Sequence, residues 1–260
     1  MFWALAEQRL DTRGFEFEQV PQDIQTLNEW ALEGRLEVTA LSLHTYPFVQ
    51  DRYILLPHGA SMGNGYGPVV VAPRPLSRDE LRSVEIVVPG RMTTAFLTLR
   101  MYLGDFAFRE LPFDRILSEV AEGRAAAGLL IHEGQLTYRD SALELCVDLG
   151  EWWLLETGLP LPLGVNVARR DIGEARMRDL SHVLRESIQA GLDNRDEAMR
   201  YAMEFGRGLD AALADRFVGM YVNELTCEYG EEGRQAVAEL LRRGEALGVF
   251  PEPVRVDFVG

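Results

Sequence analysis

Three short apolar runs in this sequence each end in residues whose types could do chemistry. They are Thr39-Ala40-Leu41-Ser42, Pro89-Gly90-Arg91-Met92-Thr93-Thr94-Ala95 and Leu129-Leu130-Ile131-His132-Glu133. The first ends in a hydroxyl, the second forms a glycine turn with two threonines, and the third ends in an ionisable pair. In open α/β sheets, ligands bind beyond the carboxyl ends of the strands, where loops meet helix N-termini. We therefore expect the three segments to face one cleft.

The turn at residues 89–95 has the features of an anion site. Gly90 permits a tight turn, and the free N–H groups after it carry the positive end of the following helix dipole. Threonine hydroxyls at 93 and 94, beside such N–H groups, make a cradle for a carboxylate or a phosphate. An ordinary N-cap at Thr93 or Thr94 would explain the same residues without a ligand.

His132 is the candidate general base. Imidazole titrates near neutral pH, and this residue directly follows a run that we interpret as a buried strand. A structural histidine is the alternative, just as Ser42 could simply end its strand. The other histidines show no metal-ligand spacing with one another or with His132, so we predict no metal site; they are His44, His58 and His182.

The charge balance argues against nucleic acid and membrane surfaces as partners. The 260 residues include 41 acidic and 26 basic side chains, for a formal net charge of −15 at pH 7. Such a surface repels phosphate backbones and anionic lipid. All the basic residues are arginine. The absence of lysine excludes Schiff-base catalysis, a pyridoxal phosphate anchor and a P-loop.

Neither the N-terminal residues nor the cysteines indicate export. The segment 1–7 has no basic residue, and its apolar run is too short for a signal peptide. No stretch approaches the roughly 20 apolar residues that span a bilayer. Cys146 and Cys227 lie far apart and fit no disulfide framework. We expect a cytoplasmic protein, either a monomer or a homodimer.

Strand and helix patterns alternate through the first two thirds of the chain, and helix dominates the last third. Apolar runs predict strands at Leu36 to Leu41, Val69 to Ala72, Val84 to Val88 and Ala127 to Ile131. Helical patterns begin after Asp23 and at Phe113, and four follow in the last third, at Ile172 to Leu192, Asp196 to Phe205, Asp210 to Asn223 and Glu231 to Leu247. The glycine-rich segment 59–67 lacks a P-loop lysine and is predicted to be a flexible or lid-like loop.

This order predicts an α/β protein of two lobes joined by two crossovers, near Ala72 and Val165, with a helical C-terminal region. Residues 1–72 and 167–260 would form a discontinuous first lobe. Residues 73–166 would form a second lobe inserted into the first.

At the same strand ends, the chain resembles the 1,4-dihydroxy-6-naphthoate synthases of the futalosine route to menaquinone. The similarity covers almost the whole chain. The matching segments include Thr26 to Arg35, Leu41-Ser42, Asp51-Arg52-Tyr53, Gly67 to Ala72, Val88 to Ala95, Asp114 to Leu117, Gly128 to Glu133, Thr157 to Gly164 and Tyr221-Val222-Asn223.

The resemblance implies a fold like that of type II periplasmic solute-binding proteins. It also implies a lyase that converts cyclic dehypoxanthine futalosine, a small-molecule carboxylate, into 1,4-dihydroxy-6-naphthoate with release of dihydroxyacetone. His132 would be the proton acceptor, and the residues at 40–42 and 93–95 would hold the substrate, namely Ala40, Leu41, Ser42, Thr93, Thr94 and Ala95. No metal or organic cofactor is implied. The alternatives are a non-catalytic solute-binding protein of the same fold and the sibling chorismate dehydratase.

The chain departs from the family pattern in two places. The family usually opens with a strand and a Ser-Pro-Cys-Pro-Asn-Asp-Thr-Phe-type loop before the helix that starts here at Phe2. We therefore expect the first lobe to lack that strand and the native protein to be longer. The family also often has lysine where Ala40 stands.

Overall fold

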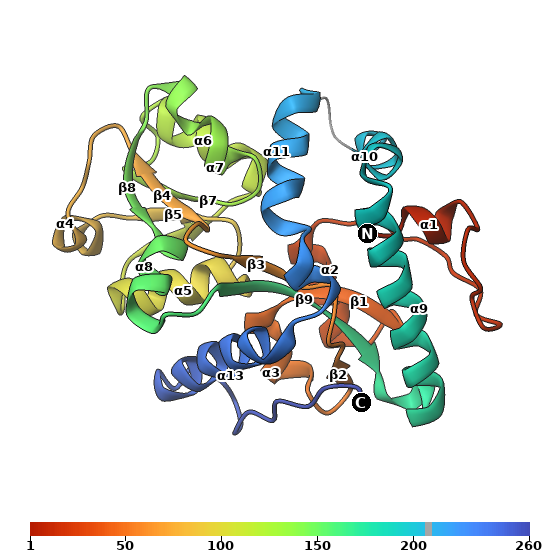
Figure 1. Ribbon diagram of the computed structural model, residues 1–260. Coiled ribbons are helices and arrows are strands. Elements are labelled where there is room, and N and C mark those ends of the chain that lie inside the picture. Colours follow the sequence, from red (N-terminus) through yellow and green to blue (C-terminus); the bar gives the residue numbers. More distant parts are fainter. Residues whose placement is uncertain (206–209) are drawn as a thin grey trace.

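Two β-sheets, each with its own hydrophobic core, organise the protein (Figure 1). The computed structural model describes residues 1–205 and 210–260. In the first sheet, β9 (Leu161–Arg169) pairs antiparallel with β1 (Val38–Ser42), β2 (Tyr53–Leu55) and β3 (Ser61–Gly63). The second sheet has the order β6 (Phe108–Glu110), β5 (Ile86–Val88), β7 (Ala127–Leu130), β4 (Val69–Ala72) and β8 (Glu144–Asp148).

Helices surround both sheets and make up most of the C-terminal third (Figure 1). Before β9 they are α1 (Trp3–Ala6), α2 (Ile24–Glu33), α3 (Tyr46–Val49), α4 (Arg78–Ser83), α5 (Thr94–Leu103), α6 (Phe113–Ala121), α7 (Gly134–Thr137) and α8 (Leu149–Thr157). After β9 they are α9 (Glu174–Asp193), α10 (Arg195–Met203), α11 (Ala211–Tyr221), α12 (Glu224–Cys227) and α13 (Gly230–Ala246). Short 3-10 turns lie at η1 (Leu43–Thr45), η2 (Tyr138–Ser141) and η3 (Arg170–Ile172).

Local sequence explains the helices that the patterns predict. The Asp23 side chain caps α2 by accepting from the backbone N–H groups of Gln25 and Thr26, and Gly34 ends that helix with φ +72°. In α6, Ile116 and Val120 recur at helical spacing and are buried against the second sheet. The helices predicted at both places, and the four predicted in the last third, are confirmed to within a few residues.

The strand pairing divides the chain differently from the boundaries expected at residues 72 and 167. Val69–Ala72 pairs with β7 and β8, so this strand belongs to the second sheet rather than to the first lobe. All of Leu161–Arg169 pairs within the first sheet. A short apolar run between prolines predicts a buried strand but carries no information about which sheet it joins. The sheets are therefore connected through residues 64–68 and through α8.

The prediction of a lid-like loop at residues 59–67 is wrong for its central part. Ser61–Gly63 forms β3 and pairs with β9, and Met62 is fully buried in the first core. A side chain at Gly63 would collide with the carbonyl oxygen of Tyr66, so the backbone turns back tightly on itself here. The glycines allow close backbone packing in this segment.

Helix α5 belongs to both cores. Its Leu97 packs in the core of the first sheet, whereas Ala95, Phe96 and Leu99 pack in the core of the second. Because one helix contacts both cores, its N-terminus is held at the junction of the two sheets. The first residue of this helix is Thr94.

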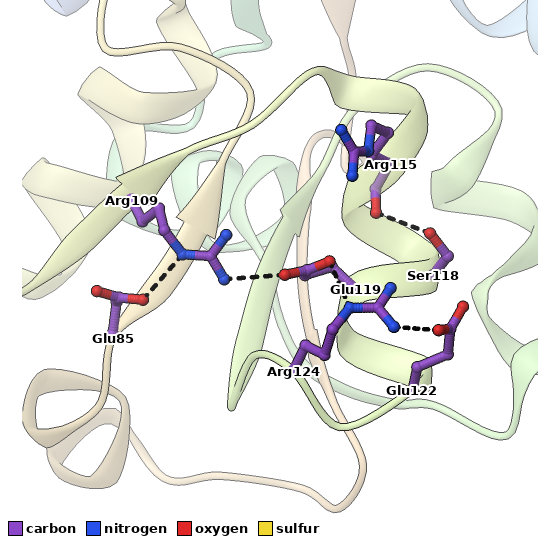
Figure 2. Close-up of polar contacts among 7 residues, drawn as sticks. All are labelled: Glu85, Arg109, Arg115, Ser118, Glu119, Glu122 and Arg124. Atoms are coloured by element: carbon purple, nitrogen blue, oxygen red, sulfur yellow. Dashed lines mark hydrogen bonds and ion pairs between the residues drawn. The ribbon is translucent and has the colours of Figure 1, made fainter.

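A cluster of charged side chains ties together β6, α6 and the segment before β5 (Figure 2). Glu119, only 9% exposed, lies at its centre. Its Oε1 atom accepts from Arg109 at 3.2 Å and its Oε2 atom from Arg124 at 2.9 Å. Arg109 also pairs with Glu85, and Arg124 with Glu122. Hydrogen bonds from Arg124 and Arg109 hold the pKa of Glu119 below its ordinary value.

No helix among residues 1–205 and 210–260 is both long and apolar enough to cross a membrane. Cys146 and Cys227 are both free thiols.

We predict that Glu119→Gln lowers the melting temperature at pH 7 by roughly 1 to 4 °C, because the neutral amide loses two charge-assisted contacts. The pKa of Glu119 is lower in the folded state than in the unfolded chain, where it is about 4.3. Its stabilising effect is therefore complete above that value and disappears as the pH falls through the folded-state pKa. Thermal melts at pH 7 and at pH 3 should show the difference from the wild type shrinking in acid.

Glu156→Gln is the matched control, since Glu156 is exposed on α8 and has no ion pair among the described residues. Equal melting temperatures for the wild type and Glu119→Gln at pH 7 would show that this cluster does not stabilise the second sheet.

Candidate active site

A cavity of about 290 Å³ lies at the junction of the two sheets. Five of the residues expected to act on a ligand line it, from both sheets: Ser42, Thr93, Thr94, Ala95 and His132. Its remaining lining is Ile24, Ser61, Pro68, Ile131, Gln135, Leu163, Gly164, Phe217, Val218, Tyr221 and Val222. The three strand ends chosen from the sequence therefore do meet at one hollow.

Ala40 and Leu41 are not among the described residues that line this cavity. The Leu41 side chain is fully buried in the first core, and Ala40 lies opposite Asn166 within the sheet. Side chains alternate between the two faces of a strand, so Leu41 points away from the face that carries Ser42. Of β1, only the last residue reaches the cavity.

Asn28 holds the Ser42 hydroxyl in a defined orientation. Asn28 lies on α2 with no exposed surface, and its Oδ1 atom accepts from the Ser42 backbone N–H at 2.8 Å. Its Nδ2 atom lies 3.0 Å from Ser42 Oγ. Because Oδ1 faces a group that can only donate, Nδ2 must be the donor to Oγ. The serine hydroxyl thus accepts from Asn28, and its own hydrogen remains available to the cavity.

The threonine hydroxyls at the start of α5 are used by the fold. Thr93 is the N-cap: its Oγ1 accepts from the Phe96 N–H at 3.2 Å and donates to the Gly90 carbonyl at 2.7 Å. Thr94 Oγ1 donates to the Leu163 carbonyl at 2.5 Å and accepts from the His44 N–H at 3.2 Å. Both hydroxyls are therefore occupied by protein partners.

The backbone amides of Thr94 and Ala95 remain as anion donors. They are the first two amides of α5, and neither has an acceptor within residues 1–205 and 210–260. Both residues line the cavity, which therefore lies at the N-terminal end of α5, where the helix dipole is positive. The two interpretations of the turn are therefore compatible: the Thr93 hydroxyl caps the helix, and the amides of Thr94 and Ala95 can bind an anion.

His44 supports this helix end from the first sheet. It lies in η1, directly after β1, with its Nδ1 atom 3.2 Å from the carbonyl oxygen of Thr93. Its ring is buried beside Phe48 and Phe250. Burial lowers the pKa of His44 to about 4, so the ring is neutral near pH 7. We expect this histidine to support α5 rather than to exchange protons.

His132 lies two residues beyond β7 in a backbone conformation that is uncommon for a side chain other than glycine, with φ +56°. Its ring lies 4.6 Å from that of Phe113 and 6.2 Å from that of Phe217, measured between centroids. Left-handed residues of this kind cost about 1–3 kcal/mol and persist where surrounding contacts hold them. Glu133, the next residue, is not among the described residues that line the cavity.

Gln135 supplies one such contact. Its side-chain amide meets three partners when Oε1 faces the backbone N–H of His132, at 3.1 Å. Nε2 then lies 2.6 Å from the Gly67 carbonyl and 2.8 Å from the Tyr221 hydroxyl. The Gln135 N–H also bonds back to the His132 carbonyl, at 3.2 Å. Gln135 therefore links the candidate base to the connecting segment 64–68 and to α11.

Helix α11 provides an aromatic wall. Phe217 and Tyr221 lie one turn apart, with ring centroids 5.2 Å from each other, and both line the cavity. The Tyr221 ring also packs edge-on against Tyr66, at 5.6 Å. Together with Ile24, this wall makes much of the cavity apolar, which suits a ligand with a flat ring.

A second, acidic cavity of about 460 Å³ adjoins the first and shares Ile24, Thr93 and Ile131 with it. It is lined by four carboxylate side chains and by no basic residue; the carboxylates belong to Asp23, Glu29, Glu110 and Asp114. Within residues 1–205 and 210–260, no group of three or more acidic, histidine or cysteine side chains could hold a metal ion.

Sequence reasoning missed the residues that orient this site. A polar Asn28 on the apolar face of α2 was a usable signal, because a buried polar side chain needs a partner. Ser61, Gln135 and Phe217 gave no comparable signal, since only tertiary structure brings them to the cavity.

Comparison with known proteins agrees with this architecture. The alkanesulfonate-binding protein of Xanthomonas axonopodis pv. citri, at 14% identity, aligns with a TM-score of 0.70 over 98% of this chain and 91% of its own. The fold is therefore that of periplasmic binding proteins, as expected. A crystal structure of a protein from Archaeoglobus fulgidus, 45% identical, aligns with a TM-score of 0.90 over 95% of this chain and 92% of its own.

Two curated relatives carry the same name, 1,4-dihydroxy-6-naphtoate synthase. The protein from Thermus thermophilus is 43% identical over 259 residues, which are all of this chain and 94% of the relative. The protein from Streptomyces coelicolor is 37% identical over 235 residues, covering 88% of this chain and 83% of the relative. A family described as "Menaquinone biosynthesis" matches residues 1–246. The chain belongs to this menaquinone biosynthesis family.

Proposed function

We propose that the protein is a lyase that converts cyclic dehypoxanthine futalosine into 1,4-dihydroxy-6-naphthoate and dihydroxyacetone. One observation carries the proposal: an imidazole, a serine hydroxyl and two helix-terminal amides line a single cavity with an aromatic wall. Such a cavity suits an aromatic carboxylate that must lose a proton. The names of the two curated relatives support the same activity.

The substrate carboxylate binds at the N-terminus of α5. The amides of Thr94 and Ala95 donate to it, and the Ser42 hydroxyl contributes its hydrogen from the opposite sheet. Charge in the adjoining cavity favours this orientation, because the carboxylates at its wall repel an anion. The uncharged, hydroxyl-bearing part of the substrate is then directed toward the acidic cavity.

His132 acts as the general base. It removes the proton of a substrate hydroxyl, whose oxygen then forms a carbonyl as the adjacent carbon–carbon bond breaks. The electron pair of that bond moves to the neighbouring carbonyl group, and formation of the aromatic ring makes the fragmentation favourable. The imidazolium later returns its proton, so the step needs no oxidant or reductant. This retro-aldol-like chemistry releases the three-carbon product.

Replacing His132 tests its role directly. We predict that His132→Asn lowers kcat by about 10²–10⁴-fold while product binding changes little, since general-base catalysis contributes that much. Asparagine also tolerates a positive φ, so the local backbone should keep its conformation. The measurement is turnover of the cyclic substrate, with calorimetry of 1,4-dihydroxy-6-naphthoate binding.

His182→Asn is the control, because His182 is half-buried on α9, pairs with Glu186 and does not line the cavity. A His132→Asn variant that keeps more than a few per cent of wild-type kcat would remove this residue from the base role. Thermal stabilisation of the wild type by substrate, with no product formed, would instead indicate a solute-binding protein.

The Asn28–Ser42 pair should govern binding rather than chemistry. We predict that Ser42→Ala raises KM about 10-fold or more and leaves kcat within a few-fold, because a hydrogen bond to a charged group is lost. Asn28→Asp should act in the same direction, since its carboxylate would accept the serine hydrogen that otherwise reaches the substrate. Steady-state kinetics on both variants measures the effect.

Ser118→Ala serves as the comparison for these variants; Ser118 is exposed on α6 and bonds to the Arg115 carbonyl (Figure 2). An unchanged KM in Ser42→Ala would place the carboxylate away from this hydroxyl.

A further inference from the structure

Tyr221 and Gln135 form a buried pair in the wall of the cavity that contains His132. Gln135 is 8% exposed and Tyr221 is 7% exposed, yet both belong to the lining. The two side chains come from distant parts of the chain, α7 and α11. The roles assigned above leave the Tyr221 hydroxyl unused, and they involve Gln135 only through its contact with the His132 N–H.

The orientation of the Gln135 amide follows from its two backbone neighbours. The Gly67 carbonyl can only accept a hydrogen bond, and the His132 N–H can only donate one. Nε2 must therefore face Gly67, and Oε1 must face His132. The same Nε2 group lies 2.8 Å from the Tyr221 hydroxyl, so it donates to that oxygen as well.

This orientation determines what the phenol can do. Because Tyr221 Oη accepts from Gln135, its own hydrogen needs a different acceptor. Among the described residues, the hydroxyl has no other hydrogen-bond partner. Tyr221 belongs to the cavity lining, so an oxygen of a ligand bound there can accept this hydrogen.

Burial keeps the phenol protonated. It raises the pKa of Tyr221 well above the ordinary value, against a lowering effect of the Gln135 hydrogen bond, and the nearby Tyr66 and Asp148 raise it further. At neutral pH the group is a neutral donor. Its ring is held between Tyr66 and Phe217, which limits the directions that the hydroxyl can take.

We propose that Tyr221 is a further catalytic residue, which donates a hydrogen bond to the substrate oxygen that gains negative charge during fragmentation, and that Gln135 is its positioning residue. The inference rests on the proposed function. As the carbon–carbon bond breaks, its electron pair moves to the adjacent carbonyl, and the oxygen of that carbonyl becomes the acceptor. The phenol keeps its proton throughout, so the proton balance of the reaction is unchanged.

Tyr221→Phe removes this donor but keeps the ring and its packing. We expect kcat to fall about 10- to 100-fold with KM within about threefold, because loss of one preorganised donor to a developing oxyanion has an effect of this order or larger. Tyr102→Phe is the matched control: Tyr102 lies on α5, packs against Trp152 of α8 and is not in the cavity lining. Its kinetics should equal those of the wild type.

Gln135→Glu tests the positioning role. A carboxylate at this position accepts the Tyr221 hydrogen instead of donating to the phenol oxygen, so the donor is turned away from the substrate. We expect kcat to fall as in Tyr221→Phe, and the double variant to lose less than the product of the two single effects. The exposed Gln235→Glu on α13 controls for the added charge.

The outcomes separate the two proposals. Full kcat in a folded Tyr221→Phe variant, or fully multiplicative effects in the double variant, would overturn this inference while the proposed function stands. No turnover by the wild type or by Tyr102→Phe would overturn the proposed function and this inference with it. A selective loss of kcat in Tyr221→Phe, at an unchanged melting temperature, would support it.

Discussion

The Thr94 hydroxyl is the contact on which the site depends. It accepts from the His44 N–H in η1, directly after β1, and donates to the Leu163 carbonyl on β9 of the first sheet. Thr94 itself begins α5, which packs mainly in the core of the second sheet. The Thr94 hydroxyl thus fixes the N-terminus of α5, which packs mainly with the second sheet, against the first sheet and the turn that follows β1. Thr94 and Ala95, whose amides begin this helix, are held in the cavity lining as a consequence.

A second constraint acts on the hydroxyl groups of the cavity. Asn28 and Gln135 each accept from a backbone N–H, so each must use its nitrogen as a donor to a neighbouring hydroxyl. The serine at 42 and the tyrosine at 221 therefore have their hydrogens left for a ligand. The buried side-chain amides of Asn28 on α2 and Gln135 on α7 thus determine that these two hydroxyls act as donors, in a cavity whose remaining walls are largely apolar.

Much of this site was predictable because the ends of strands can be predicted from where apolar runs stop in the sequence. Apolar runs that stop at Ser42 and His132, and a glycine turn before Thr93, identify where loops meet a sheet edge. The adjacent residues Ala40 and Leu41 were less predictable, since the direction of a side chain depends on strand register. The lobe boundary at Ala72 failed for a related reason: pairing partners are set by tertiary contacts, which a four-residue apolar run does not encode.

The central claim is that an aromatic carboxylate binds with its anionic end on the first amides of α5 and its reacting end beside His132. A crystal structure of the protein with 1,4-dihydroxy-6-naphthoate tests this most directly. We predict carboxylate oxygens ~2.7–3.2 Å from the amide nitrogens of Thr94 and Ala95, with the naphthalene ring against Phe217. A carboxylate bound elsewhere, or a ring lying outside this cavity, would contradict the account.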